Sequence, residues 1–408
     1  MNIRITAAQS IKNILLPISG SKSETNRLLL LQALFPGLLL KNVSNSDDSE
    51  VMIKALQSAG ATIDIHHAGT AMRFLTAYFS IQEQREVILT GSPRMKERPI
   101  GILVEALRQL GANIQYVENE GFPPIKITGK KLTNNKITLN ANVSSQYISA
   151  LLLVAAKLEN GLKLTLKGEI TSVPYIKMTL ALLNEIGIQT QFEGHEITVF
   201  PKSEIEKETI TVESDWSSAS YYYSVAALSE PETAITLSSY KANSLQGDSA
   251  LAEIYKTLGV HTVFKENQIV LKKSAIALQS LKFDLNKTPD IAQTIAVSCF
   301  GLGIGCHLTG LHTLKIKETD RLEALKKELS KLGANISVTN DSLTLEPSAG
   351  INPEIKIETY NDHRMAMAFA PLALKVPVLI EDAAVVSKSY PDFWNDFQRL
   401  GFQIQECS

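Results

Sequence analysis

The sequence predicts an α/β fold in two domains, each made of three related units with strands outside and apolar helices inside. Three observations predict this fold. The 408 residues are too many for one ordinary hydrophobic core. A helix–glycine–strand pattern recurs six times, and a second set of more apolar helices alternates with it. Two domains of three units each account for all three observations.

The repeated pattern is an amphipathic helix that ends at a glycine and leads into a short strand. The six glycines are Gly60, Gly111, Gly187, Gly259, Gly333 and Gly401. Each is expected to close its helix in the left-handed conformation, which glycine adopts without steric clash. Several strands are expected to turn back as hairpins, as in FEGHEITV, FKENQIVL and VTNDSLTL. No returning strand follows ATIDI, so the first unit is expected to be trimmed.

The second set of helices is apolar nearly all round, which predicts that these helices are buried. They begin in the segments SGSKSETNRLLLLQAL, AGTAMRFLTAYF, SSQYISALLLVAA, SSASYYYSVAAL, TPDIAQTIAVSCF and NDHRMAMAFAPLAL. The chain is expected to cross between domains near residues 18 and 214. Residues 1–18 plus 214–408 would form one discontinuous domain with three units, and residues 19–213 the inserted domain with three units. The first strand, residues 2–7, could pair with the C-terminal half.

Composition excludes several classes of function. The formal net charge of -2 gives no bulk attraction for nucleic acid or an anionic membrane. The three cysteines and seven histidines show no metal-ligand spacing, so the thiols are expected to be reduced. The start MNIRITAAQS has no signal-peptide core, and the most apolar run, Ile291 to Gly305, is too short to span a bilayer. A soluble cytoplasmic protein without a nucleic-acid or membrane partner is expected.

The starts of the apolar helices are candidate anion sites. A helix N-terminus offers free N–H groups and about half a positive charge. Basic residues stand near several of these starts: Lys22, Arg27, Arg73 and Arg364. Ends of this kind, gathered from both domains around a shared cleft, would suit phosphates and carboxylates. The alternative is that the Ser and Asp residues at these starts merely cap the helices.

Two charged segments allow both a structural and a functional interpretation. GSPRMKERP is either a solvated loop or a mobile loop that delivers Arg98 to an anion. In KIKETDRLEAL, Thr319 or Asp320 could cap a helix, leaving Lys317 and Glu318 on the preceding loop. These charges could form ordinary i,i+3 and i,i+4 pairs. Glu318 could instead serve proton transfer.

Two further helix starts carry acidic or basic residues. Arg364 leads a helix too apolar for solvent, so its guanidinium needs an anionic partner from the protein or from a ligand. Asp290, just after Pro289, is either a simple first-turn carboxylate or a functional one. Lys388 in VSKSYPDFW would by itself be assigned to the surface. No P-loop and no Ser-His-Asp triad can be inferred.

Taken together, these segments resemble the EPSP synthase (3-phosphoshikimate 1-carboxyvinyltransferase) family in order and over nearly the whole chain. The matching segments are SGSKSETNR, AGTAMRFL, LTGSPRMKERPIG, SSQYISALLL, SVPYIKMTLALL, ESDWSSASYY, LQGDSAL, TPDIAQTIA, KIKETDRL, YNDHRMAMAF and SKSYPDFW. KETDR and NDHRMAM are quite specific, whereas S-S-Q alone is weak. The resemblance implies a two-domain inside-out α/β barrel joined by a double crossover, with three βαβαββ units per domain around buried helices.

The resemblance also implies an activity. Members of this family transfer the enolpyruvyl group of phosphoenolpyruvate to the 5-hydroxyl of 3-phosphoshikimate, by addition and elimination through a tetrahedral intermediate. The products are 5-enolpyruvylshikimate 3-phosphate and phosphate, in the pathway to chorismate and the aromatic amino acids. Asp290 matches the general base, and Glu318 with Lys22 matches the groups that serve C3 of phosphoenolpyruvate. No metal and no organic cofactor is implied. An induced-fit closure and a monomer are expected.

The family's ligand residues carry over to named positions here. For 3-phosphoshikimate they are Lys22, Ser23, Arg27, Ser144, Ser145, Gln146, Ser172, Tyr175, Asp290 and Lys317. For phosphoenolpyruvate they are Lys22, Gly69, Arg98, Gln146, Arg321, Arg364 and Lys388. The physical reason is that both substrates are polyanions. Like unit charges at ~4 Å repel by about 4 kcal/mol at an effective dielectric constant of 20, so several fixed cations are needed.

The sequence departs from the family pattern at His67, Phe74 and Thr313, which affects the expected phosphoenolpyruvate contacts and the response to glyphosate. Two rival functions can be weighed. The UDP-N-acetylglucosamine enolpyruvyl transferases share the fold but usually carry a loop cysteine, and none stands near GSPRMKERP. A non-catalytic anion-binding protein could keep the fold, but the presence of Lys22, Asp290 and Glu318 argues against it.

Overall fold

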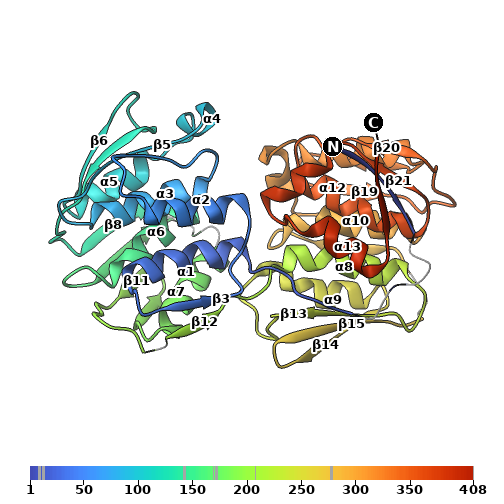
Figure 1. Cartoon of the computed structure of the whole chain (residues 1–408), viewed down its shortest axis with the longest axis horizontal. Coiled ribbons are helices and arrows are strands. Elements are labelled where there is room, and N and C mark those ends of the chain that lie inside the picture. Colours follow the sequence, from blue (N-terminus) through green and yellow to red (C-terminus); the bar gives the residue numbers. More distant parts are fainter. Residues whose placement is uncertain are drawn as a thin grey trace. The chain divides into compact units, whose positions relative to one another are not determined.

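The computed structural model describes residues 1–7, 11, 14–140, 144–168, 170, 173–206, 208–275 and 279–407. The chain forms two compact units (Figure 1). The continuous unit comprises Gly20–Val212, and the discontinuous unit comprises Met1–Ser19 and Glu213–Ser408.

One strand order recurs in five of the six sheets that the described residues form: a parallel pair of strands, then two strands added antiparallel. In the continuous unit these sheets are β4 (Thr62–Asp64), β5 (Glu86–Thr90), β7 (Ile125–Thr128), β6 (Asn113–Tyr116), and β8 (Lys136–Asn140), β9 (Leu162–Lys167), β11 (Glu196–Val199), β10 (Thr190–Glu193). The sixth sheet has only β3 (Leu39–Lys41) beside β12 (Thr209–Thr211). The trimmed first unit is therefore confirmed.

The discontinuous unit has three sheets of the common order. They are β2 (Leu15–Leu16), β13 (Ala234–Ser238), β15 (Gln268–Lys273), β14 (Val260–Lys265); β16 (Leu281–Asp284), β17 (Cys306–Thr309), β19 (Leu343–Leu345), β18 (Ile336–Val338); and β20 (Ile355–Ile357), β21 (Val378–Ile380), β1 (Asn2–Thr6), β22 (Gln403–Cys407). In the last sheet the N-terminal strand β1 lies between β21 and β22, as expected for a first strand that pairs with the C-terminal half.

The strands expose one face and bury the other. In β8, Ile137 and Leu139 are buried whereas Lys136, Thr138 and Asn140 are exposed. Because side chains alternate across a strand, the apolar side chains lie on one face of the sheet, and that face packs against the helices. The expected hairpins are present as β10–β11, β14–β15 and β18–β19.

The predicted glycine caps are correct at five of the six positions. Gly111, Gly187, Gly259, Gly333 and Gly401 all have positive φ angles, as the left-handed cap requires. The prediction is wrong for Gly60, which does not have a positive φ. Its helix, α2 (Asp47–Gln57), ends earlier, because Ser58 is already extended, with φ -72° and ψ 129°. Gly60 therefore lies in the connection to β4.

Three apolar helices lie inside each unit, and more amphipathic helices lie between them and the surface. The inner helices are α1 (Lys22–Leu34), α3 (Gly69–Ser80) and α6 (Ser145–Ala155) in the continuous unit, and α8 (Trp216–Leu228), α10 (Ala292–Gly301) and α12 (His363–Phe369) in the discontinuous unit. The other helices are α4 (Pro93–Lys96), α5 (Gly101–Gln109), α7 (Val173–Glu185), α9 (Leu251–Lys256), α11 (Arg321–Lys331) and α13 (Phe393–Leu400). Short 3-10 turns are η1 (Gly247–Ala250), η2 (Pro289–Ile291), η3 (His312–Ile316), η4 (Ala370–Leu374) and η5 (Ala383–Lys388).

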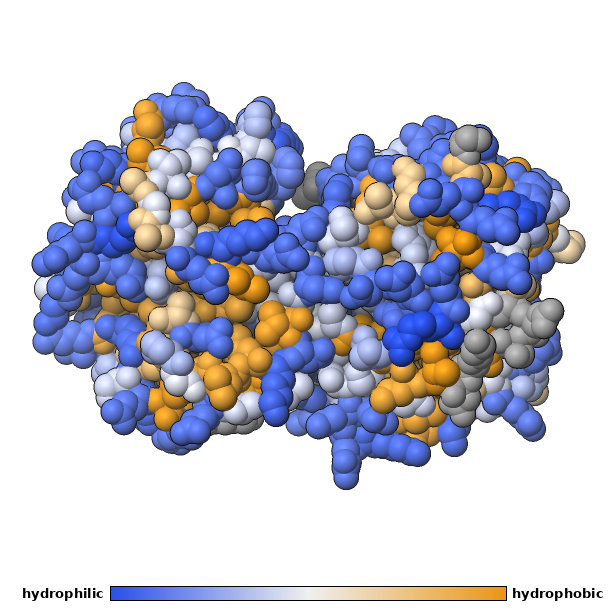
Figure 2. All heavy atoms as spheres, viewed as in Figure 1, coloured by the Kyte–Doolittle hydropathy of each residue, from blue (hydrophilic) through white to orange (hydrophobic). Residues whose placement is uncertain are grey.

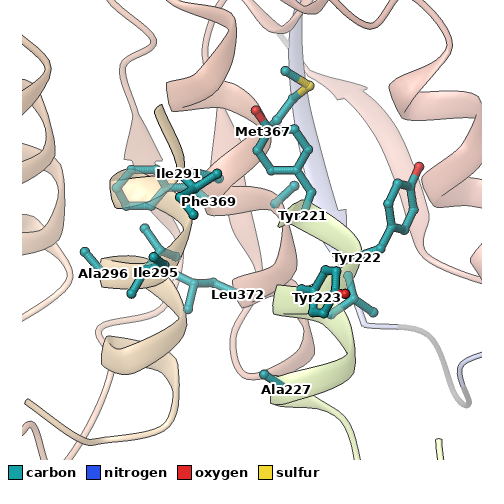
Figure 3. Close-up of a cluster of buried hydrophobic side chains, with 14 of the residues drawn as sticks. Tyr221, Tyr222, Tyr223, Ala227, Ile291, Ile295, Ala296, Met367, Phe369 and Leu372 are labelled. Atoms are coloured by element: carbon teal, nitrogen blue, oxygen red, sulfur yellow. The ribbon is translucent and has the colours of Figure 1, made fainter. Parts of the chain in front are cut away.

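Figure 3 shows why the inner helices of the discontinuous unit are apolar all round. Tyr221 and Ala227 of α8, Ile295 of α10, and Phe369 and Leu372 of the α12–η4 segment come together in one buried cluster. Every residue of α8 is buried, so no face of this helix can be polar without a partner. Burying a leucine or phenylalanine side chain contributes about 1.5–3 kcal/mol, so the cluster stabilises the packing of these helices against one another.

The surface is mainly polar. On the face shown in Figure 2, hydrophilic residues cover most of both units and the apolar residues form scattered patches. Among the described residues, no helix combines the length and the apolar character needed to cross a bilayer.

Candidate active site

The first helix of the continuous unit places two predicted ligand residues at its start. Lys22 is the first residue of α1, and its Nζ lies 3.2 Å from Asp48 Oδ2. Arg27 is buried, with Nε donating to Thr179 Oγ1 at 2.8 Å and Nη2 donating to Ser149 Oγ at 3.0 Å. Its Nη1 donates to the Ser23 carbonyl at 2.7 Å. These hydrogen bonds orient the guanidinium but supply no full negative charge.

Burial lowers the pKa of Arg27 to about 10, and the charges of Tyr175 and Glu24 act in the opposite direction. The guanidinium also lies over two rings, 5.5 Å from the centroid of Phe74 and 5.8 Å from that of Tyr175. A buried cation held mainly by neutral groups is stabilised further by an anion that reaches it. A carboxylate or phosphate would suit this buried cation chemically.

A second pair of cations lies at the start of α3. Arg98 packs on Gly69 so closely that a Cβ at this position would be 2.5 Å from Arg98 Nη1. Only glycine allows the guanidinium to rest on the backbone there. Arg73, one turn along α3, donates to the carbonyls of Gly69 and Pro99. Burial, and then the charge of Arg98, lower the pKa of Arg73. The two like charges favour an anion nearby.

The start of α6 carries the remaining predicted ligands of the continuous unit. Ser144 caps the helix by accepting the Gln146 N–H at 3.3 Å. The side chain of Gln146 donates to Thr70 Oγ1 of α3 at 3.1 Å, so the first turns of α3 and α6 lie side by side. Ser145 is buried at the same helix start, and Tyr175 stands on α7. Ser172 lies outside the described residues.

In the discontinuous unit, Asp290 is the centre of an ion cluster. Its Oδ1 lies 2.9 Å from Arg321 Nη1 and 3.3 Å from Lys317 Nζ, and its Oδ2 lies 3.3 Å from Arg364 Nη2. Burial alone would raise the pKa of Asp290, but Arg364, Lys317 and Arg321 outweigh it and hold the pKa well below the ordinary value. The carboxylate is therefore ionised and is positioned by three cations at once.

Arg321 connects three carboxylates. Besides Asp290, its Nη2 donates to Glu318 Oε2 at 2.8 Å and its Nε to Asp362 Oδ2 at 2.5 Å. Arg321 is 2% exposed and Asp362 is 0% exposed. Asp320 caps α11 by accepting the N–H groups of Leu322 and Glu323, which decides between the two expected caps. Glu318 is left on the preceding loop, as expected.

Two more of the predicted ligands, Arg364 and Lys388, lie at or beside the start of α12. Asp362 caps this helix by accepting the Arg364 N–H at 2.8 Å. The anionic partner that Arg364 requires is supplied at least partly by the protein, in Asp290. However, its buried Nε has no hydrogen-bond partner among the described residues, so the guanidinium keeps an unused donor. Lys388 Nζ donates to the Asn361 carbonyl at 2.6 Å, which places this lysine beside the same helix start.

Several residues that support the candidate site were not identified from the sequence. Asp248 accepts hydrogen bonds from Ser217 and Thr288, and Ser217 Oγ in turn accepts from Arg364 Nη2 at 3.2 Å. Burial, and then the charge of Asp290, raise the pKa of Asp248. Its segment, LQGDSAL, gives no local sign that it meets the starts of α8 and α10. Asp48 and Thr179 were missed for the same reason.

The three departures from the family pattern have defined surroundings. His67 Nδ1 lies 2.8 Å from Ser92 Oγ. Phe74 is fully buried under Arg27. Thr313 Oγ1 is buried without a hydrogen-bond partner among the described residues.

Comparisons with known proteins agree with these observations. The family model described as EPSP synthase (3-phosphoshikimate 1-carboxyvinyltransferase) matches residues 57–397. The chain is 48% identical over 410 residues to a 3-phosphoshikimate 1-carboxyvinyltransferase of Bacteroides fragilis, covering 99% of each chain. It is 36% identical to one of Haemophilus influenzae, covering 94% of this chain and 95% of that one.

Two solved structures share the fold. An EPSP synthase of Acinetobacter baumannii superposes with a TM-score of 0.84 at 20% identity, covering 99% of this chain and 100% of that chain. The enolpyruvyl transferase NikO of Streptomyces tendae superposes with a TM-score of 0.71 at 13% identity, covering 99% and 98%. The predicted α/β architecture of repeated units is confirmed by this likeness.

Proposed function

Because the chain belongs to the EPSP synthase family and catalyses the 3-phosphoshikimate 1-carboxyvinyltransferase reaction, we propose that Asp290 and Glu318 transfer its protons while the predicted ligand residues hold its substrates. The observation that carries the proposal is the ion cluster at Asp290. There, two arginines and one lysine predicted to bind substrates lie within 3.3 Å of the predicted base.

We assign the two substrates to different sets of residues. Ser144, Ser145 and Ser172 would receive the phosphate of 3-phosphoshikimate, with help from Lys317. Gln146 and Tyr175 would lie against its ring and carboxylate. The free N–H groups of a helix start favour a phosphate there. Phosphoenolpyruvate would be held by Arg98 on the Gly69 backbone. Its other ligands would be Lys22, Gln146, Arg321, Arg364 and Lys388. At the first helix, 3-phosphoshikimate would meet Lys22, Ser23 and Arg27.

The proposed chemistry is an addition followed by an elimination. The 5-hydroxyl oxygen attacks C2 of phosphoenolpyruvate and its proton passes to Asp290, while C3 gains a proton from Glu318, assisted by Lys22. The bond from C2 to the phosphate oxygen of the tetrahedral intermediate then breaks, phosphate leaves, and C3 returns a proton to Glu318. Proton transfer by positioned groups of this kind contributes about 10²–10⁴-fold to a rate.

Substrate binding would also activate the base. In the substrate-free chain, Arg321, Lys317 and Arg364 make Asp290 a weak base, since their charges lower its pKa. An anionic substrate that takes up Arg321 and Arg364 would neutralise part of this positive charge. The pKa of Asp290 would then rise toward its ordinary value, and the carboxylate would accept a proton more readily.

The direct test is a coupled assay of phosphate release with purified protein. We expect phosphate only when 3-phosphoshikimate and phosphoenolpyruvate are both present. A non-catalytic anion-binding protein would release none. An enolpyruvyl transferase for UDP-N-acetylglucosamine would release phosphate with that sugar nucleotide in place of 3-phosphoshikimate.

We expect Glu318→Gln to lower kcat by about 10²-fold or more, with a much smaller change in the affinity for either substrate. Glutamine keeps the size of the side chain and one acceptor for Arg321 Nη2, but it cannot exchange a proton with C3. Steady-state kinetics and calorimetry with 3-phosphoshikimate separate the two effects. Comparable losses of turnover and affinity would contradict the role.

We expect Ser144→Ala to weaken 3-phosphoshikimate binding by roughly 10-fold or more, because a hydrogen bond to a charged group contributes about 1.5–3 kcal/mol. The KM for phosphoenolpyruvate should change less. Calorimetry gives the first value and the phosphate assay the second. Ser144→Thr, which keeps the hydroxyl and the helix cap, is the control. Equal effects on both substrates would count against the phosphate assignment.

We also propose that the protein acts as a cytoplasmic monomer without a nucleic-acid partner. The formal net charge of -2 offers no bulk attraction for polyanions. All three cysteines are free, which suits a reducing compartment.

A further inference from the structure

A buried carboxylate on α11 has no place in the chemistry proposed above. Glu328 is 0% exposed and stands seven residues after Arg321, which is two helical turns, so both side chains lie on one face of α11. Burying a charge is costly unless it is paired and hydrogen-bonded. Glu328 satisfies this condition: its Oε1 accepts from Tyr360 Oη at 2.6 Å, and its Oε2 accepts from Lys331 Nζ at 2.6 Å.

Two of the three partners named for Glu328 belong to the segment that leads into α12. Its Oε2 also accepts the Glu358 N–H at 3.1 Å, so Glu328 binds this segment through one side chain and one backbone group. Two residues after Tyr360, Asp362 accepts a hydrogen bond from Arg321 Nε. Helix α11 therefore binds the segment 358–362 at two points, through Glu328 at one end and through Arg321 at the other.

The backbone between these two points adopts an unfavourable conformation. Tyr360 and Asn361 are consecutive left-handed residues, with φ angles of 54° and 56°. A non-glycine residue in a sparsely populated region of this kind costs of order 1–3 kcal/mol and persists only where its surroundings hold it. The hydrogen bonds of Glu328 to Glu358 and Tyr360 provide such a restraint.

This turn determines where three predicted phosphoenolpyruvate ligands lie. The Asn361 carbonyl accepts from Lys388 Nζ at 2.6 Å. Asp362 holds Arg321 and caps the helix at Arg364. A change in the path of residues 360–361 would therefore move Lys388, Arg321 and Arg364 together. The serines assigned to the phosphate of 3-phosphoshikimate, Ser144, Ser145 and Ser172, belong to the continuous unit, whereas this turn belongs to the discontinuous unit.

We propose that Glu328 is a positioning residue for phosphoenolpyruvate, because it stabilises the left-handed turn at Tyr360 and Asn361. This turn and the adjoining Asp362 in turn position Arg321, Arg364 and Lys388. Glu328 touches no substrate and acts through Tyr360 and the Glu358 backbone. The inference rests on the proposed function and names a determinant of affinity for one of its two substrates.

Two substitutions test the inference. Glu328→Gln removes the charge and one acceptor, and the milder Tyr360→Phe removes only the hydroxyl that donates to Glu328 Oε1. We expect both to raise the KM for phosphoenolpyruvate, by about tenfold in Glu328→Gln. The KM for 3-phosphoshikimate should change less than about twofold. In the double variant the effects should not add, because Glu328 and Tyr360 are direct hydrogen-bond partners.

The matched control is Glu323→Gln on the same helix. Glu323 is 59% exposed, and its carboxylate lies 3.5 Å from Lys326 Nζ. Neither KM should change in this variant. If Glu328→Gln and Tyr360→Phe instead raise both KM values equally, or lower only thermal stability, Glu328 has a purely structural role and the inference is overturned.

A second readout is independent of activity. In the substrate-free, full-length protein, hydrogen–deuterium exchange of the amides in residues 358–364 should be faster in Glu328→Gln than in the wild type, while β18–β19 stays unchanged. Unchanged exchange in 358–364 would refute the positioning role even in an active enzyme. Absence of wild-type phosphate release would refute the proposed function instead, so the two failures are distinguishable.

Discussion

Replacing Asp290 with asparagine is expected to lower kcat by about 10²–10⁴-fold, the range that general-base catalysis contributes. Asparagine has almost the same shape but cannot take the proton of the 5-hydroxyl. It also removes the negative charge that Arg321, Arg364 and Lys317 surround. The three cations are then no longer paired with the Asp290 carboxylate and can interact more strongly with an anionic substrate. Affinity for 3-phosphoshikimate should therefore be retained or increased while turnover falls.

Phosphate release at saturating substrate measures kcat, and calorimetry measures the dissociation constant of 3-phosphoshikimate. Asp284→Asn is a suitable control, since Asp284 is an exposed carboxylate on the segment before Asp290, and its Oδ1 accepts the N–H of Asn286, two residues away, at 3.0 Å. Its kinetics should match the wild type. A fall in affinity as large as the fall in turnover would show that Asp290 binds substrate rather than acting as the base.

Replacing Arg321 with lysine is expected to lower both stability and activity. Arg321 donates to Asp290, Glu318 and Asp362 from three different nitrogens, and a single ammonium group cannot reproduce this planar geometry. Asp362 is fully buried, so a lost partner leaves an uncompensated charge. Breaking a buried pair costs about 3–5 kcal/mol, and a lysine that keeps part of the interaction should cost roughly 2–4 kcal/mol.

This loss corresponds to a fall in Tm of roughly 4–16 °C for a unit of this size. Differential scanning calorimetry measures it, and phosphate release measures the accompanying loss of activity. Arg4→Lys provides the control, because Arg4 is 36% exposed and pairs with the half-exposed Glu354. Such a surface change should stay within about 0.5 kcal/mol. A Tm for Arg321→Lys equal to that of the control would contradict the account of the cluster.

Much of the fold could be predicted because its signals are local. A helix that ends at a glycine and a strand that alternates are both properties of about ten consecutive residues. Six copies of such a segment made the repetition visible, and the all-round apolar helices identified the buried layer. Gly60 marks the limit of this reasoning. The same helix–glycine pattern occurs there, but the helix ends at Gln57, and the local signal cannot tell the two endings apart.

The candidate site could be predicted only as a set of residues, and their roles stay predictions. Local patterns placed Asp290, Arg321 and Arg364 at helix starts, and the family resemblance named their functions. Nothing in the neighbouring residues indicates that Asp248 accepts from Ser217 and Thr288, 31 and 40 residues away along the chain.

By itself, the sequence determined the α/β class, the six units, the buried helices and the membership of the EPSP synthase family. Only the tertiary structure decided which charges meet. Asp290 and Asp362 lie 31 and 41 residues from Arg321, yet both bind its guanidinium, and Glu328 reaches Tyr360 across 32 residues. The physical reason is that helix and strand periodicity arises from neighbours within one or two turns. Ion pairs depend instead on angstrom-scale distances between segments, which are fixed when the apolar helices pack.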